Sequence, residues 1–347
     1  MKSGIRANPR GINQVRYVFR VPLLAFSLLF GTATGQSEPA RAPAAVPVFR
    51  SGVIRVWGEN HTNPDPKDNW GRDPQVQSAP ETSADLAFGG SECLAMLKDG
   101  TCRFWGNPHS WHPEQEKFRQ APPLDNVSDA VSIAAGDSHF LLAHKDGTVS
   151  AWGDNSQGQC QVPDGLAEVT SVAAGKWFSL ALKKDGTVVA WGDNRLGQCR
   201  VPEGLAKVKR IRAGWFHSVA LLEDGSLRAW GFNYDRQIEF PPNLPPVKDV
   251  RAGAAHTIAL LENGDVRVWG SDANGLVSTG NKLRGVRQIA CGDHHCVALD
   301  AIGLRLWGQN GFGQTGKPAL DGNVVAVFAG GNTTGVMFEA PRLPDFP

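Results

Sequence analysis

A Trp-Gly pair recurs along this chain at intervals of about 39 residues, and this period constrains the fold more than any other feature. The pairs begin at Trp57, Trp105, Trp152, Trp191, Trp230, Trp269 and Trp307. A second set of glycines, each following an apolar run, alternates with them at Gly89, Gly136, Gly175, Gly214, Gly253, Gly292 and Gly330. Units of this length cannot bury an apolar face alone, so they must stack on their neighbours.

Each unit contains signals for three short strands. One apolar run precedes the repeat glycine, and two more follow it, separated by an Asp-Gly or Asn-Gly pair such as Asp185-Gly186 or Asn263-Gly264. These pairs between apolar runs indicate hairpins, because such turns need positive φ. No stretch has helical periodicity, so the fold class is all-β.

The two ends of the repeat array complement each other. Trp57-Gly58 has no hairpin before it, and the unit that begins at Gly330 stops after Phe338 without a Trp-Gly pair. The two halves make one complete blade if the chain closes into a ring. We therefore predict a seven-bladed β-propeller of three-stranded blades, closed when the N-terminal strand 53–56 pairs into the C-terminal blade. An open solenoid is the alternative, although it would normally carry polar caps.

The first residues are typical of an export signal. Basic residues precede an apolar run at 21–30, and small residues follow it up to position 35. This pattern predicts a cleaved signal peptide over 1–35, a Pro- and Ala-rich linker over 36–50, the propeller over 51–340 and a tail over 341–347. The apolar run is shorter than the roughly 20 residues that span a bilayer. We therefore expect a periplasmic, secreted or cell-surface protein without a stable membrane span, and a retained anchor is the alternative.

Charge argues against a nucleic-acid partner. The chain has a formal charge of +1, but the signal segment holds five of the 35 basic residues and none of the 34 acidic ones. The mature chain is therefore acidic, whereas a nucleic-acid binder shows a basic face. We expect a monomer.

Five of the six cysteines look like small-residue substitutions within repeats, and Cys102 has no obvious partner. Cys160 and Cys199 follow Gly-Gln, Cys93 and Cys296 stand four residues after a repeat glycine, and Cys291 replaces an alanine. Free or buried thiols are therefore expected rather than a disulfide framework.

The residues themselves resemble a known family. The pattern Ala-Gly-x-x-His-x-Leu-Ala-Leu, followed by Asp-Gly-x-Val-x-Ala-Trp-Gly-x-Asn, is similar to the regulator of chromosome condensation repeat family. This resemblance covers 51–340 and implies a seven-bladed propeller. The short period, the Gly-Gln-x-x-Val-Pro connections and the export signal resemble the secreted β-lactamase-inhibitory branch, which implies inhibition of an extracytoplasmic enzyme through aromatic loop residues.

Residues that recur in every unit are interpreted as scaffold. The Trp of each Trp-Gly pair packs between blades, and the histidines three residues after a repeat glycine are satisfied and partly buried. These histidines are His139, His217, His256 and His295.

Function is expected where the repeat varies. The loops after the repeat glycine and those after Trp-Gly leave the sheet at the same end, so they share one face. Trp177, Trp215 and Phe216 fall there in adjacent repeats, as aromatic anchors of a binding site would. Lys176, Asp137, Asp293 and His294 share this ring of loops, and Tyr234 and Phe312 lie in loops after Trp-Gly. A structural role plugging the channel mouth is the alternative.

Two longer loops on that face, 63–75 and 107–119, add Trp70 and Trp111 as further candidates. His109 and His112 in the second loop have chelating spacing but no third ligand, so no metal site is predicted.

The chain shows no nucleophile elbow, phosphate-cradling loop or zinc spacing, so no catalytic or cofactor-binding residues are assigned. The sequence predicts an exported, non-catalytic module that binds a protein partner outside the cytoplasm, by inhibition or scaffolding. Carbohydrate binding by paired aromatics is the alternative. Less favoured is an enzyme that uses Asp137, Asp293 and His294 at the channel mouth.

Overall fold

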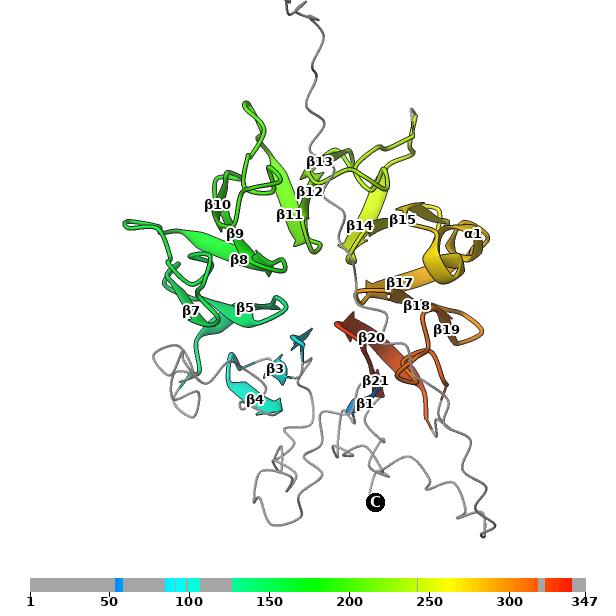
Figure 1. Ribbon diagram of the computed structural model, residues 1–347. Coiled ribbons are helices and arrows are strands. Elements are labelled where there is room, and N and C mark those ends of the chain that lie inside the picture. The colour runs from blue at the N-terminus through cyan, green and yellow to red at the C-terminus, as the bar shows by residue number, and fades with distance from the viewer. Residues whose placement is uncertain are drawn as a thin grey trace, which may run out of the picture. The chain divides into compact units, whose positions relative to one another are not determined.

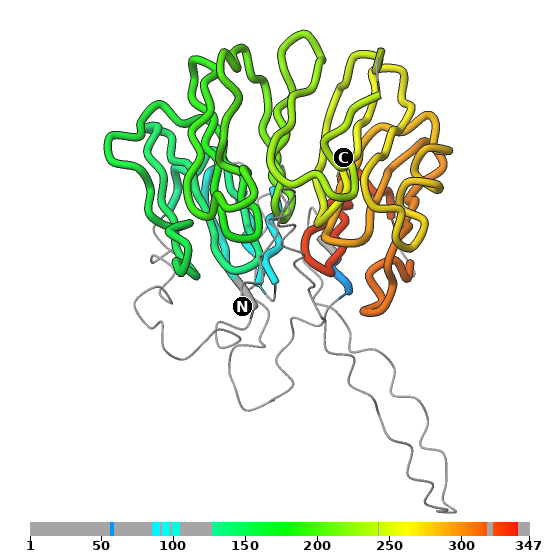
Figure 2. Tube along the Cα trace, turned by 45° about the horizontal axis from the view of Figure 1, so that its top comes forward, coloured from blue at the N-terminus to red at the C-terminus, as the bar shows by residue number. Residues whose placement is uncertain are grey.

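Seven three-stranded antiparallel sheets are arranged around a central axis in the computed structural model (Figures 1 and 2). The structure describes residues 54–58, 85–90, 92–97, 99–106, 127–241, 243–317 and 322–338, all within the unit Ala45–Pro347. The fold class predicted from the sequence is confirmed.

Six of the blades are continuous in the chain and repeat one strand order. They comprise β2 (Asp85–Phe88), β3 (Glu92–Met96) and β4 (Cys102–Gly106); β5 (Ala130–Ala135), β6 (His139–His144) and β7 (Val149–Gly153); β8 (Val169–Ala174), β9 (Phe178–Lys183) and β10 (Val188–Gly192); β11 (Val208–Ala213), β12 (His217–Leu222) and β13 (Leu227–Gly231); β14 (Val247–Ala252), β15 (His256–Leu261) and β16 (Val266–Gly270); β17 (Val286–Cys291), β18 (His295–Asp300) and β19 (Leu304–Gly308). The first strand of each blade lies nearest the axis (Figure 1).

The seventh blade joins the two ends of the described chain, as the complementary half units predict. β1 (Ile54–Gly58) pairs with β21 (Thr333–Phe338), which pairs in turn with β20 (Val324–Gly330). Trp57 is buried, and its indole Nε1 donates to the carbonyl of Gln314 at 3.1 Å. The N-terminal strand therefore closes the ring.

Glycine is required at the hairpin turns by backbone conformation. Gly186 has a φ of +81°, whereas Asp185 avoids the left-handed region. The Asp185 carboxylate accepts from the amide and the hydroxyl of Thr187, at 2.9 and 2.6 Å. Asp-Gly therefore encodes the turn through a hydrogen-bonded Asp followed by a left-handed Gly.

The repeat glycines are required by space. A Cβ on Gly214 would lie 2.6 Å from Nδ1 of His217 and would also meet the carbonyl of Gly253 in the next blade. The ring three residues later covers the glycine, and the neighbouring blade approaches its backbone. Both contacts need a residue without a side chain.

The core lies between adjacent blades. Trp230 of β13 packs on Leu180 and Leu182 of β9 in the preceding blade, and Trp269 of β16 packs on Val219 of β12 in the same way. The scaffold role of these tryptophans is confirmed, because each fills the space between its own sheet and the one before it.

Buried histidines connect neighbouring blades. His139 Nε2 lies 3.0 Å from Ser179 Oγ, and that hydroxyl donates to the carbonyl of Gln159 at 2.7 Å. Because the hydroxyl has one hydrogen, His139 must donate from Nε2. His217 contacts Thr257 and His295 contacts Thr334 in the same way. These histidines are fully buried, rather than partly buried as expected, and burial lowers the pKa of His139, His217 and His295 to about 4.

One loop forms a short helix that the sequence periodicity did not indicate. A 3₁₀ turn, η4 (Ala273–Gly275), leads into a short helix, α1 (Leu276–Gly280). The Asp272 carboxylate accepts from the amides of Val277 and Ser278, at 2.7 and 2.9 Å. Asp272 stands where other loops carry Asn, and a carboxylate at this point stabilises free amides at a helix start.

The expectation of free thiols is wrong at one pair. Cys291 and Cys296 lie directly opposite each other on β17 and β18 and form a disulfide. Their Cα atoms are 4.2 Å apart across the hairpin, so the sulfurs meet without backbone movement. Cys93, Cys102, Cys160 and Cys199 are free, as expected.

The predicted signal peptide and linker, and residues 339–347, lie outside the described residues. Within the described part of the chain, no helix is long and apolar enough to cross a membrane.

Ring closure can be tested by truncation. A chain that begins at Glu59 lacks β1 and the buried Trp57, so it should lose about 3–5 kcal/mol of unfolding free energy from the missing aromatic alone. The matched control begins at Ser51 and keeps the strand. Urea unfolding followed by tryptophan fluorescence measures both, and equal midpoints would show that β1 does not close the ring.

The histidine contacts predict sensitivity to acid. The pKa of His217 is about 4 in the folded protein and about 6.5 in an unfolded chain. Its stabilising contribution is therefore present above about pH 6.5 and is lost as the pH falls toward 4. Between about pH 7.5 and pH 5, the wild type should lose about 2 kcal/mol more than His217→Phe. Phe178 occupies the same position in another blade, so the variant should fold. Urea unfolding at both pH values measures the difference, and parallel losses would contradict the assignment.

Candidate functional site

The variable loops share one end of the propeller, as predicted. In the third blade, Gly192 pairs with Phe178, and the amide of Asp193 donates to the carbonyl of Trp177 at 2.9 Å. The equivalent bond joins Phe232 to Phe216 at 2.8 Å. The loop after each Trp-Gly pair is therefore tied to the loop after the repeat glycine, and we call the end that they form the mouth.

Backbone hydrogen bonds between blades hold the mouth together. The amide of Lys176 donates to the carbonyl of Trp215 at 3.1 Å, and that of Ala254 donates to Asp293 at 2.9 Å. Asp293 donates in turn to the carbonyl of Gly331 at 2.8 Å. These bonds fix the loops of neighbouring blades relative to one another, so the side chains that they carry have set positions.

Five aromatic side chains form a continuous cluster at the mouth, which we call the aromatic cluster: Trp177, Trp215, Phe216, Phe232 and Tyr234. The Phe216 ring centroid lies 5.5 Å from Trp177 and 6.4 Å from Trp215. Phe232 lies 6.5 Å from Phe216 and stacks on Tyr234 at 6.2 Å. Tyr234 is 84% exposed, whereas the other four are half-buried. The cluster thus runs from the channel to an exposed aromatic ring.

Two cations lie over the tryptophans. Lys176 Nζ is 4.2 Å from the Trp215 ring centroid and 5.2 Å from that of Trp177. The Arg195 guanidinium lies 5.7 Å from the Trp177 centroid, and the Asp193 carboxylate holds it at 2.8 Å. Cation–π attraction orients both indoles, because it favours a charge above the ring face.

The three titratable candidates at the mouth have defined surroundings. Lys176 Nζ lies 3.9 Å from the Asp137 carboxylate. The His294 ring packs edge-on against Trp215, with centroids 5.2 Å apart. Burial, and then the charge of Lys176, lower the pKa of His294, so the ring is neutral at neutral pH. Asp293 belongs to the backbone network described above.

The structure brings most of the predicted binding residues together. Lys176, Trp177, Trp215, Phe216 and His294 are linked by a continuous series of contacts, and Tyr234 joins this series through Phe232. Phe312 is half-exposed in the loop after Trp307 and lies outside the aromatic cluster.

Four residues considered in the sequence analysis are not placed by the structure. Trp70, Trp111, His109 and His112 lie outside the described residues.

Sequence reasoning missed Phe232 and Arg195. Phe232 follows a Trp-Gly pair directly, where the other described loops carry polar side chains: Asp154, Asp193, Ser271 and Gln309. An apolar residue in that place was the available signal. The sequence contains no such signal for Arg195, because its contact with the Trp177 ring depends on where the fold places that ring.

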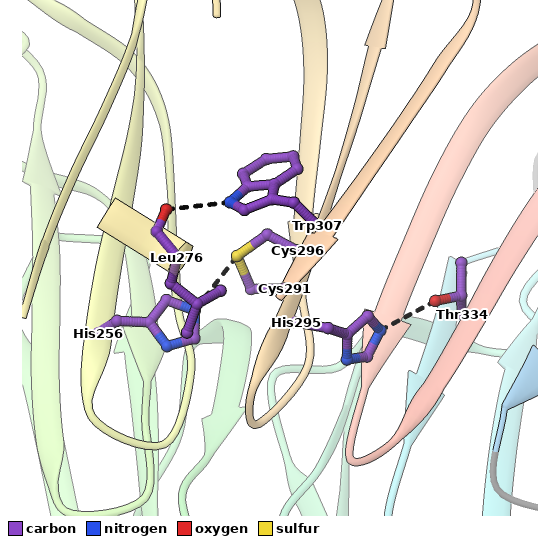
Figure 3. Close-up of a disulfide and its surroundings, with 7 residues drawn as sticks. All are labelled: His256, Leu276, Cys291, His295, Cys296, Trp307 and Thr334. Atoms are coloured by element: carbon purple, nitrogen blue, oxygen red, sulfur yellow. Dashed lines mark hydrogen bonds between the residues drawn. A yellow bond between two sulfur atoms is a disulfide. The ribbon is translucent and has the colours of Figure 1, made fainter. Parts of the chain in front are cut away.

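One buried trio in the described chain has metal-ligand atoms. His256, Cys291 and Cys296 place theirs within 4.8 Å of one another, and His256 Nε2 is 3.2 Å from Cys296 Sγ (Figure 3). The two sulfurs are bonded to each other, so thiolate ligation requires prior reduction. In the oxidised form, His256 Nε2 contacts the sulfur of Cys296, whereas the equivalent histidines at other junctions contact a Ser or Thr hydroxyl.

These features define the class of protein as a seven-bladed β-propeller with an aromatic mouth. Five of its segments match the family model of the Regulator of chromosome condensation (RCC1) repeat, at residues 130–159, 169–198, 208–237, 247–276 and 286–314. The chain therefore carries RCC1 repeats, as the resemblance of the sequence indicated.

Solved structures agree on the fold. Prp20p from Saccharomyces cerevisiae is 20% identical, with 87% of this chain and 93% of that chain covered and a TM-score of 0.62. The same yeast protein bound to Kap60 gives 20% identity, coverage of 89% and 96%, and a TM-score of 0.63. Human WBSCR16 is 19% identical, with coverage of 83% and 99% and a TM-score of 0.62. No curated protein matches the sequence significantly.

The mouth geometry predicts a shift in the titration of His294. Because the Lys176 charge lowers the pKa of His294, Lys176→Met should raise that pKa toward the ordinary value of about 6.5. A histidine-resolved NMR titration measures it. Lys209→Met, which removes an exposed charge from β11, is the matched control and should leave the titration unchanged. An unchanged pKa in both variants would place Lys176 away from the ring.

Proposed function

We propose that this propeller is an exported, non-catalytic module that captures a protein partner at the aromatic cluster. The main observation that supports this proposal is the continuous run of aromatic rings from Trp215 to the exposed Tyr234. Aromatic residues on a preorganised surface contribute much of the energy of protein interfaces, because they bury large areas with little loss of side-chain entropy. The backbone bonds between blades supply this preorganisation.

Proteins with the same fold support a binding role. The structure of Prp20p is described together with its binding properties to Gsp1p and histones, and another holds the yeast protein bound to Kap60. The fold thus serves as a protein-binding scaffold in a chain that is 20% identical to this one.

Two observations support a location outside the cytoplasm. The basic and apolar start of the sequence has the form of a secretory signal. The Cys291–Cys296 bridge is of the kind that persists in oxidising compartments. We therefore propose an extracytoplasmic partner and a monomeric propeller.

Inhibition of an enzyme by this face is a finer proposal that follows from the sequence resemblance. In the loops directly after the repeat glycines, Trp and Phe occur only in two adjacent blades, at Trp177, Trp215 and Phe216, and Ala254 and Ala255 stand at these places in the next blade. A target that needs aromatics around the whole rim would not fit, so the proposed target differs from that of the inhibitory branch.

A catalytic role for the mouth has less support. Asp137 faces Lys176, and His294 packs against Trp215, so both side chains help to hold the cluster in place. Carbohydrate binding has one favourable observation, the stacked and exposed pair of Phe232 and Tyr234. We keep it as an outcome of the test.

The test combines Trp177→Ala and Trp215→Ala in one variant. Affinity capture from the native exported fraction, with mass spectrometry, identifies the partner, and calorimetry then measures its affinity. The double variant should melt near the wild type, since both rings are half-exposed, yet bind at least about 100-fold more weakly. Ile302→Ala, which is 86% exposed on the β18–β19 turn at the opposite end, is the matched control and should bind normally.

Three outcomes would oppose the proposal. If the double variant did not fold, the two tryptophans would have a structural role in the propeller rather than a role in binding. Equal binding by the double variant and the wild type would place the partner elsewhere. Glycan-array binding through Tyr234, without a protein ligand, would favour the carbohydrate alternative.

A further inference from the structure

Two adjacent blades place arginine on the channel wall, where most of the other blades place alanine. Two residues before each repeat glycine, the inner strand places a side chain on the central channel, a cavity of about 230 Å³. In ring order these residues are Ala87, Ala134, Ala173, Arg212, Arg251, Ala290 and Phe328. Alanine occupies four of these seven places and phenylalanine one, so the two neighbouring arginines, which bring charge to the channel, need a separate explanation.

Positive charge is in local excess around these arginines. Three guanidinium groups share the Asp249 carboxylate: Arg210 at 2.6 Å, Arg251 at 2.8 Å and Arg212 at 3.8 Å. One carboxylate cannot neutralise three cations. Burial and the neighbouring Arg251 lower the pKa of Arg212 to about 9, which still leaves the group charged at neutral pH.

A second carboxylate, Asp85, lines the same channel from the blade of β2. Desolvation by the surrounding blades raises the pKa of Asp85 although the residue keeps contact with solvent, and the charges of Arg212 and Arg251 oppose that rise. Asp85 makes no ion pair within 4.0 Å with any described residue. The remaining channel acids, Asp137 and Asp293, stand at the mouth beyond the repeat glycines. The arginine pair therefore keeps unbalanced charge.

The arginine pair also keeps unused hydrogen-bond donors. Arg212 donates from Nε to the carbonyl of Val250 at 3.2 Å and from Nη1 to that of Ile211 at 2.9 Å. Arg251 donates from Nη1 to Asp249 and to the carbonyl of Val250. Within the described chain, Nε and Nη2 of Arg251 have no hydrogen-bond acceptor, and Arg212 Nη2 has only the longer ion pair. These bonds fix the guanidiniums at the channel wall while leaving donors for a ligand.

We propose that Arg212 and Arg251 form a binding site for a small oxyanion, a phosphate or a carboxylate, inside the propeller channel. The planar guanidinium matches both anions through paired N–H donors. The channel volume admits a small anion with some water, whereas a macromolecule is too large for it. The site lies below the mouth and does not depend on the aromatic cluster or its partner.

Calorimetric titration at constant ionic strength tests the site with two probes, inorganic phosphate and malonate, in a zwitterionic buffer. The wild type should bind one probe at one site per chain, and the probe that binds identifies the chemical source. Arg251→Ala should weaken binding at least about tenfold, because it removes a charge-assisted donor pair. Lys248→Ala removes an equal charge from the exposed side of the same strand and should bind as the wild type does.

Arg251→Lys distinguishes the guanidinium fork from charge alone. This variant keeps the cation and should fold, yet it should bind more weakly than the wild type, because an ammonium cannot make the paired contact. Binding of neither probe by a folded wild type would overturn the proposal. Equal losses in Arg251→Ala and Lys248→Ala would also overturn it, since they would show only a general effect of charge.

Discussion

The ring depends on three regular junctions between blades, at each of which one main-chain carbonyl of a glutamine accepts two hydrogen bonds from the next blade. The carbonyl of Gln159 accepts from Ser179 Oγ at 2.7 Å and from Trp191 Nε1 at 2.9 Å. Gln198 accepts from Ser218 and Trp230 in the same way, both at 2.8 Å. The buried Gln159 side chain accepts from the amide of Gln157 and donates to Asp154, and so shapes the loop that presents its carbonyl. The Gly-Gln motif therefore encodes a contact between blades, because an unpaired buried indole or hydroxyl would cost free energy.

The contacts that hold the blades together are separate from the side chains at the mouth, so the residues at the mouth can vary. The Trp, Ser or Thr, and Gln contacts lie below the loops, and the rim bonds use backbone atoms only. Lys176 donates its amide to Trp215 whatever side chain either position carries. A change such as Ala to Trp at the mouth therefore alters the binding surface while the junction beneath it keeps its hydrogen bonds. Function can change at these positions with little effect on the fold.

Sequence periodicity predicted the blades, their turns and the ring closure, because each depends on a residue type at a repeated place, and departures from the repeat identified four of the five residues of the aromatic cluster. It did not predict the Cys291–Cys296 bridge, which depends on hairpin register rather than on residue type. Nor did it predict the arginine pair. Arg212 and Arg251 replace alanine visibly in the sequence, but periodicity alone does not say which face of the inner strand borders the channel. Phe232 was missed although it is an apolar residue directly after a Trp-Gly pair, where the other described loops carry polar side chains.

The junction between the blades of β15 and β18 shows what happens when the shared carbonyl contact is incomplete. Cys296 stands where other blades carry Ser or Thr, and Leu276 of α1 replaces Gln, so its carbonyl accepts from Trp307 Nε1 at 3.0 Å (Figure 3). A disulfide sulfur has no hydrogen to donate, so the second bond of the regular junction is lost. Two features compensate for it: the covalent link from β17 to β18, and the burial of Leu276 among Cys291, Cys296 and Trp307. The stability of this junction therefore depends on the redox state of the surroundings. At the neighbouring junctions it depends on pH, through histidines that must stay neutral.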